Sequence, residues 1–87
     1  MSAGAHQVVG RVLDRAGHPA AGASVMWLHG PVPLPDVAQL TQADGSFVMS
    51  APVAGQYRLG CRGDPGGQAT LDLTMGPQGA RVTLRLV

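Results

Sequence analysis

Residues 40–59 read LTQADGSFVMSAPVAGQYRL and contain two short runs in which apolar and polar side chains alternate. Ahead of the first run, the dipeptide Asp44-Gly45 is typical of a tight hairpin turn, because glycine readily adopts the positive φ that such a turn requires. Phe47 and Met49 are two residues apart, so they lie on the same face of the strand that follows. This pattern predicts a turn followed by a half-buried strand.

The second run follows another group of chain-breaking residues. Pro52 ends the preceding strand, and Gly55 permits the chain to reverse. Tyr57, Leu59 and Cys61 are spaced at intervals of two, so we expect them on one buried face, with Cys61 acting as a small apolar residue. Both turns therefore predict hairpins between consecutive strands.

The composition of the chain favours β-structure. The 87 residues include 13 glycines and 7 prolines but no lysine, glutamate, asparagine or isoleucine. Helices of ordinary length are hard to place in such a chain, because good helix formers are missing and helix breakers recur. The length suits one hydrophobic core, so we expect a single all-β domain over residues 1–87, with residues 1–6 flexible.

The same alternation recurs along the rest of the chain. Strands are predicted at residues 7–14, 23–28, 68–75 and 82–86, with a weaker candidate at 37–42. The proline-rich residues 29–36 cannot pair as a central strand and are predicted to form a loop or an edge segment. About seven short strands separated by turns are the pattern of a β-sandwich.

Three motifs, taken in order, resemble those of the carboxypeptidase regulatory-like domain. They are GxVxDxxGxPxxGAxV at residues 10–25, TxxDGxF at residues 41–47 and GxYxL at residues 55–59. The resemblance extends from about Val8 to Leu86. It implies a seven-stranded Greek-key β-sandwich, similar to transthyretin and to immunoglobulin domains, without catalytic residues of its own. Such domains act in larger proteins as rigid attachments, folding aids or interaction modules.

The motif residues have structural roles on physical grounds as well. Gly17 and Gly45 close turns, and Pro19 stiffens the start of an extended segment. Phe47 and Tyr57 fill the core, and the Tyr57 hydroxyl is available to hold a neighbouring loop. Trp27 is expected to share this core, because it alternates with Ala23 and Val25 on one side of its strand.

Two relatives of this family carry chemistry that the present sequence lacks. The transthyretin-like hydrolases of purine breakdown end in Tyr-Arg-Gly-Ser, whereas this chain ends in LRLV. Pilin-type domains close an internal bond between lysine and asparagine or aspartate, and no lysine is present. Neither activity is expected here.

The polar residues show no spacing typical of a catalytic or metal site, so we expect no enzyme, no cofactor and no metal. The serines of the predicted strands lie on no recognisable nucleophile turn, and the histidines have no ligand spacing such as HxH. A zinc site assembled across loops is the alternative for the histidines. The aspartates of the loops are explained by turn formation. The residues considered are Ser24, Ser46, Ser50, His6, His18, His29, Asp36, Asp44 and Asp64.

Charge and hydropathy limit the partners and the location. The formal net charge is +1, and the six arginines are scattered along the sequence, which argues against nucleic-acid binding. No run approaches the about 18 apolar residues of a membrane span. The first residues lack the features of a secretory signal, so we expect a cytoplasmic protein or part of an assembly, unless the chain was cut from a longer exported protein.

The outward positions of the predicted strands carry more apolar residues than a solvated sheet requires. Five such residues are predicted to contact a protein partner or a second copy: Val9, Leu13, Met26, Leu28 and Val48. The alternative is that they are ordinary isolated apolar residues of a protein surface.

Three functions remain to be weighed. A non-catalytic structural or interaction module, forming part of a particle, fibre or spike, would use the outer apolar face. An accessory ligand-binding module, for carbohydrate for example, would need an exposed aromatic side chain, and Trp27 and Tyr57 both alternate with core residues. A small hydrolase would need a catalytic group that we do not find. The sequence favours the first, with the second as the alternative.

Overall fold

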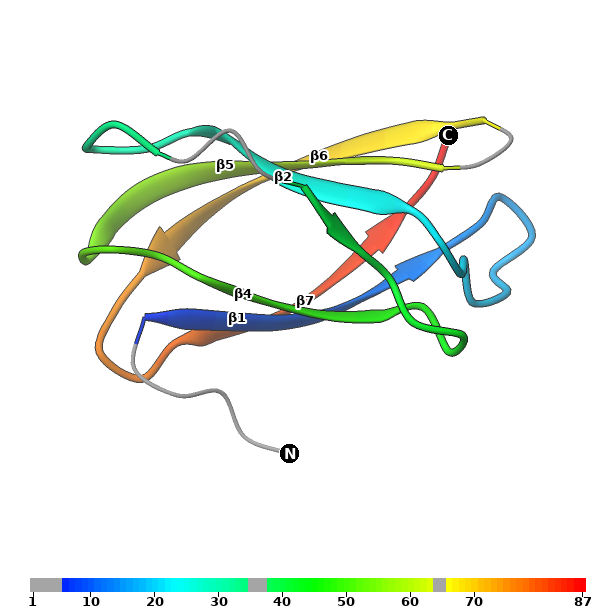
Figure 1. Ribbon diagram of the computed structural model, residues 1–87, viewed down its shortest axis with the longest axis horizontal. Coiled ribbons are helices and arrows are strands. Elements are labelled where there is room, and N and C mark those ends of the chain that lie inside the picture. The colour runs from blue at the N-terminus through cyan, green and yellow to red at the C-terminus, as the bar shows by residue number, and fades with distance from the viewer. Residues whose placement is uncertain (1–5, 35–37, 64–65) are drawn as a thin grey trace.

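Two β-sheets make up the computed structural model, which describes residues 6–34, 38–63 and 66–87 (Figure 1). The described residues form seven strands and no helix. Sheet A has the order β4 (Ser46–Ser50), β1 (Gln7–Leu13), β7 (Ala80–Arg85). Sheet B has the order β3 (Gln39–Leu40), β2 (Ser24–His29), β5 (Gly55–Arg62), β6 (Gln68–Met75). The predicted all-β, sandwich-like architecture is confirmed.

Strand directions differ between the two sheets. In sheet A, β1 is antiparallel to β4 and parallel to β7, whereas every pair in sheet B is antiparallel. Beyond β7 the chain turns to the other sheet, where Val87 and Gln68 exchange backbone hydrogen bonds of 3.0 and 3.2 Å. The C-terminus therefore lies beside β6, as Figure 1 shows.

One hydrophobic core fills the space between the sheets. The alternation expected from the sequence is confirmed: Val8, Val25 and Leu59 have no exposed surface, and Phe47 and Tyr57 are each 2% exposed. Other buried core residues are Val12, Ala23, Met49, Ala51, Cys61, Met75, Leu84 and Leu86. Burial of this apolar surface is the main favourable contribution to folding.

Gly10 lies on the core side of β1, directly opposite Phe47 of β4. A Cβ at Gly10 would come within 2.5 Å of Cε1 of Phe47 and 2.9 Å of Cγ2 of Val82. The glycine thus leaves space in the core that the aromatic ring fills, which explains why a strand interior tolerates glycine here.

The turn at Asp44-Gly45 is present, but the hairpin predicted around it is wrong. Gly45 has a φ of 79°, and the Asp44 carboxylate accepts hydrogen bonds from the backbone N–H and the hydroxyl of Ser46. The strands on either side belong to different sheets, because β3 pairs with β2 and β4 pairs with β1. Val12 N donates to the Gly45 carbonyl at 2.8 Å, so the turn is held against β1.

The hairpin predicted at Gly55 is wrong for the same reason. Gly55 has a φ of 144°, as a reversal requires, but β4 before it lies in sheet A and β5 after it lies in sheet B. Period-two alternation marks which face of a strand is buried, but it does not identify the strand's neighbour. In sheet B, β5 pairs with the next strand, β6, over their full length.

The loop between these sheets is fastened by the two aromatic residues of sheet B. The Tyr57 hydroxyl donates to the Val53 carbonyl at 2.8 Å, and Trp27 Nε1 donates to the Ser50 carbonyl at 3.1 Å. The two ring centroids are 4.8 Å apart. The expectation that Tyr57 holds a neighbouring loop is confirmed.

The remaining turn predictions are also confirmed where they fall on described residues. Gly17 has a φ of 88°, and Pro19 forms an isolated antiparallel bridge with Leu13. The expected flexibility of residues 1–6 falls mainly on residues 1–5, which lie outside the described residues. The same is true of Asp36 and Asp64, which were expected in turns.

Candidate functional site

The five apolar residues predicted to form one outer surface lie on opposite sides of the sandwich. Val9 and Leu13 belong to β1 and Val48 to β4, all in sheet A. Met26 and Leu28 belong to β2 in sheet B. The expectation of a single face is therefore wrong, because consecutive strands β1 and β2 enter different sheets.

On sheet A the predicted apolar residues form only a small group. Val9 and Val48 are directly opposite each other, and Val48 is 38% exposed. Leu13 is half-buried at the end of β1, opposite Arg85. The other outward positions of this sheet are polar or charged.

The larger exposed apolar surface lies on sheet B. We call Met26, Leu28 and Leu40 the leucine strip. Leu28 is 49% exposed and Leu40 is 65% exposed, whereas Met26 is half-buried between them. Leu40 is opposite Ser24, and Ser24, Met26 and Leu28 alternate with core residues, so the three side chains share the outer face.

Leu28 reaches across β5 because the neighbouring position has no side chain. A Cβ at Gly60 would lie 2.7 Å from Cδ1 of Leu28. The register between β2 and β5 shifts after Trp27, so that His29 is opposite Arg58. This irregularity puts Leu28 and His29 side by side at one end of the strip.

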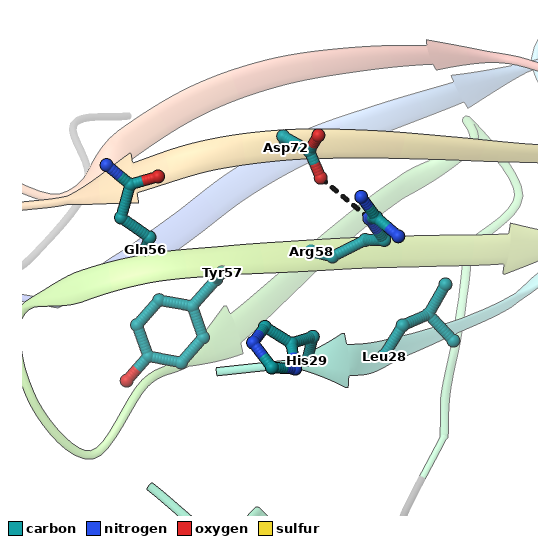
Figure 2. Close-up of a pocket in the computed structure, with 6 residues that line it drawn as sticks. All are labelled: Leu28, His29, Gln56, Tyr57, Arg58 and Asp72. Atoms are coloured by element: carbon teal, nitrogen blue, oxygen red, sulfur yellow. Dashed lines mark hydrogen bonds and ion pairs between the residues drawn. The ribbon is translucent and has the colours of Figure 1, made fainter. Parts of the chain in front are cut away.

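A shallow hollow of about 620 Å³ adjoins Leu28 (Figure 2). It is lined by Leu28, His29, Gln56, Tyr57, Arg58 and Asp72. Arg58 Nε donates to Asp72 Oδ1 at 2.8 Å between strands β5 and β6, as the dashed line in Figure 2 shows. This hydrogen bond lowers the pKa of Asp72 and raises the pKa of Arg58, and the attraction between the two opposite charges adds a smaller shift in the same directions.

The described residues include one thiol, that of Cys61, and several His and Asp side chains. Cys61 is buried, and burial raises the pKa of its thiol, which disfavours the nucleophilic thiolate. Within residues 6–34, 38–63 and 66–87, no group of three or more His, Cys, Asp or Glu side chains is placed to hold a metal ion.

Sequence reasoning missed Leu40, the most exposed member of the strip. Thr41, which follows Leu40, is buried, and its hydroxyl accepts from Ala23 N at 2.9 Å and donates to the Ala20 carbonyl, but this burial is not visible in the sequence. A residue next to a buried one in a strand points outward.

No protein-family profile and no curated protein sequence matches this chain. No helix in the described part of the chain is long and apolar enough to cross a membrane.

Proposed function

We propose that the chain is a non-catalytic β-sandwich module that assembles with further copies of itself through the outer face of sheet B, as a subunit of a larger assembly. The observation that carries this proposal is the leucine strip, where Leu28 and Leu40 are 49% and 65% exposed on the same face as Met26. Contiguous exposed apolar surface is typical of protein interfaces.

The charges on the outer face of sheet B favour a second copy as the occupant. Arg58 and Arg62 of β5 and Asp72 of β6 all lie on this face. In a two-fold symmetric pair the same surface meets itself, so the Arg58–Asp72 ion pair of one copy offers both signs of charge to the same ion pair of the other. Burial of the leucine strip would provide the apolar centre of such an interface.

The experiment is the solution mass measured by light scattering across a wide range of protein concentration. We expect the mass to rise above that of the monomer, and Leu28→Asp to restore a monomer because a charge would be buried in the interface. Val48→Asp is the matched control, since Val48 is similarly exposed but lies on sheet A. Circular dichroism checks that both variants fold.

Two results would contradict self-assembly. If the wild-type protein were a monomer at every concentration, self-assembly would be excluded, and the chain would be a module that docks onto a different protein. A mass reduced equally by Val48→Asp and Leu28→Asp would show that the assembly surface is not specific to sheet B.

The family and the finer fold class form part of this proposal. We infer a Greek-key, transthyretin-like sandwich of the carboxypeptidase regulatory-like type, supported by seven strands in two sheets among the described residues and by the turn glycines Gly17, Gly45 and Gly55. An experimental structure superposed on members of that family tests this assignment.

Ligand binding is the alternative function, and the hollow beside Leu28 favours it. Gln56, Arg58 and Asp72 offer hydrogen-bonding groups there. Stacking against a sugar would need an exposed ring, but Tyr57 is 2% exposed and Trp27 is half-buried. Binding on a glycan array that Arg58→Gln abolishes would support this alternative.

A further inference from the structure

Arginines that are scattered along the sequence are brought together on the outer face of sheet A. We call Arg11 of β1 and Arg81 and Arg85 of β7 the arginine face. All three are exposed, and all three alternate with core residues of their strands. Arg11 is opposite Thr83, which lies between Arg81 and Arg85 on the same side of β7.

The spacing of these three residues puts their charges within reach of one ligand. Arg81 and Arg85 are the two diagonal neighbours of Arg11 across the parallel pair of β1 and β7, a relation in which long side chains are able to reach one another. A shallow hollow of about 570 Å³ lies on this side of the sheet, and Arg11 and Arg81 line it together with the apolar pair Val9 and Val48.

The charge of the arginine face is not compensated within the sheet. The outward positions of β1, β4 and β7 carry no aspartate or glutamate. In the described part of the chain, the ion pairs are His18 with Asp14 and Arg58 with Asp72, and neither involves this face. The contrast with Arg58 is informative, because that arginine has a carboxylate directly opposite on the next strand.

Two nearby groups interact with the arginine face without neutralising it. Asp44 lines the same hollow, and Arg11 contributes to lowering its pKa, but its Oδ1 already accepts two hydrogen bonds from Ser46. Arg85 donates to the Arg15 carbonyl, which satisfies one N–H group and leaves the positive charge in place. The sheet thus presents three arginines against one aspartate at its margin.

We propose that the arginine face is a docking site for an acidic segment of a partner protein, rich in aspartate and glutamate. Guanidinium groups bind carboxylates with two parallel hydrogen bonds, and Val9 and Val48 provide an apolar contact beside Arg11 and Arg81. A second copy is not the occupant of this face, since two surfaces of the same sign repel each other. The proposal does not depend on self-assembly, which uses the opposite sheet.

An acidic protein segment fits better than a nucleic acid. Single-stranded nucleic acids bind to surfaces that combine positive charge with aromatic rings on which bases stack. Phe47 and Tyr57 are in the core, and Trp27 belongs to sheet B. Phe47 contributes to the lining of the hollow but is only 2% exposed, so the arginine face offers charge and aliphatic surface without an exposed ring for stacking.

The test is the affinity of a fluorescein-labelled peptide of aspartates and glutamates with one central leucine, measured by fluorescence anisotropy at low and at physiological salt. We expect binding that weakens with salt, and a loss of roughly two- to fivefold for each of Arg11→Gln, Arg81→Gln and Arg85→Gln. The triple variant should lose at least about tenfold.

Matched controls separate the arginine face from net charge. Arg62→Gln removes the same charge from an exposed position on sheet B, and we expect it to leave the affinity unchanged. A peptide with glutamine and asparagine in place of the acids should not bind. The triple variant should unfold at a temperature close to that of wild type, because removing clustered like charges offsets the loss of the hydrogen bond from Arg85 to the exposed Arg15 carbonyl.

The proposal is overturned by any of three results. The acidic peptide does not bind at low salt, or the triple variant binds it as tightly as wild type does. Alternatively, single-stranded DNA or vesicles of anionic phospholipid bind more tightly than the peptide and lose affinity in the triple variant, which would assign the face to phosphates.

Discussion

Gly10→Ala tests the packing of the core with the smallest possible change. A Cβ at Gly10 would lie 2.5 Å from Cε1 of Phe47 and 2.9 Å from Cγ2 of Val82, so the ring or the strand must move. Overpacking of a core costs roughly 1–3 kcal/mol. Alanine is more favourable than glycine in a strand by roughly 0.5–1 kcal/mol, which offsets part of that cost. We expect a net decrease in the free energy of unfolding of about 1 kcal/mol, with limits of about 0 and 2.5 kcal/mol.

The assay is urea unfolding, supported by thermal unfolding. For a domain of this size, 1 kcal/mol corresponds to a shift in Tm of about 4–8 °C. Gly76→Ala is the matched control, because a Cβ there would have no other atom within 4 Å. That variant should be as stable as wild type or slightly more stable, since it only restricts the unfolded chain.

A double-mutant cycle identifies the side chain responsible. Shortening the ring by Phe47→Leu should make the further change Gly10→Ala less costly than it is in wild type. If Gly10→Ala cost as much in the Phe47→Leu background as in wild type, the reasoning would be refuted, because Phe47 would not be the side chain that fills the space above Gly10.

Two further predictions concern the loops that join the sheets. Tyr57→Phe should lower the free energy of unfolding by about 1 kcal/mol in urea, because the Val53 carbonyl loses the hydroxyl donor at 2.8 Å; unchanged stability would argue against its role in holding the loop. The pKa of Asp44 is lowered, and the hydrogen bond from the Ser46 hydroxyl is the largest cause. The ionised carboxylate therefore stabilises the fold above the unfolded pKa, near 4, and this stabilisation is lost as pH falls through the lower folded pKa. The Tm of Asp44→Asn should fall less than the Tm of wild type between neutral and acidic pH. An equally steep fall in both proteins would contradict this prediction.

Burial on each strand was predictable because it depends on a local period. Side chains alternate across a strand whatever its neighbour is, so the inward positions of Phe47, Tyr57 and Leu59 follow from the sequence alone. The turn glycines were predictable for a similar reason, since a positive φ at Gly17 and Gly45 is a local property.

Strand pairing was not predictable in this way. The residues of β3 and β4 flank a tight turn, yet they join different sheets because each finds a better neighbour elsewhere in the chain. That choice depends on contacts between residues far apart in sequence, such as Val8 with Met49, which no short motif encodes. The single outer face predicted for Val9 and Met26 was wrong for this reason.

The same physical reason explains why the arginine face was missed. Arg11 and Arg81 are 70 positions apart, and the parallel pairing of β1 with β7 brings them together. A count of charges along the chain treats them as isolated. Leu40 was missed differently, because its strand has only two residues and shows no alternation of its own.

The two outer faces differ in the kind of partner that their charges allow. Sheet B combines Arg58, Arg62 and Asp72 with an apolar strip, so it is able to face a copy of itself, whereas the uniform charge of sheet A disfavours that arrangement. Because the core separates the sheets, burial of one face leaves the other exposed. Assembly through sheet B would therefore display one arginine face on each copy. A partner with several acidic segments would then be bound through several of these faces at once, more tightly than one face alone could hold it.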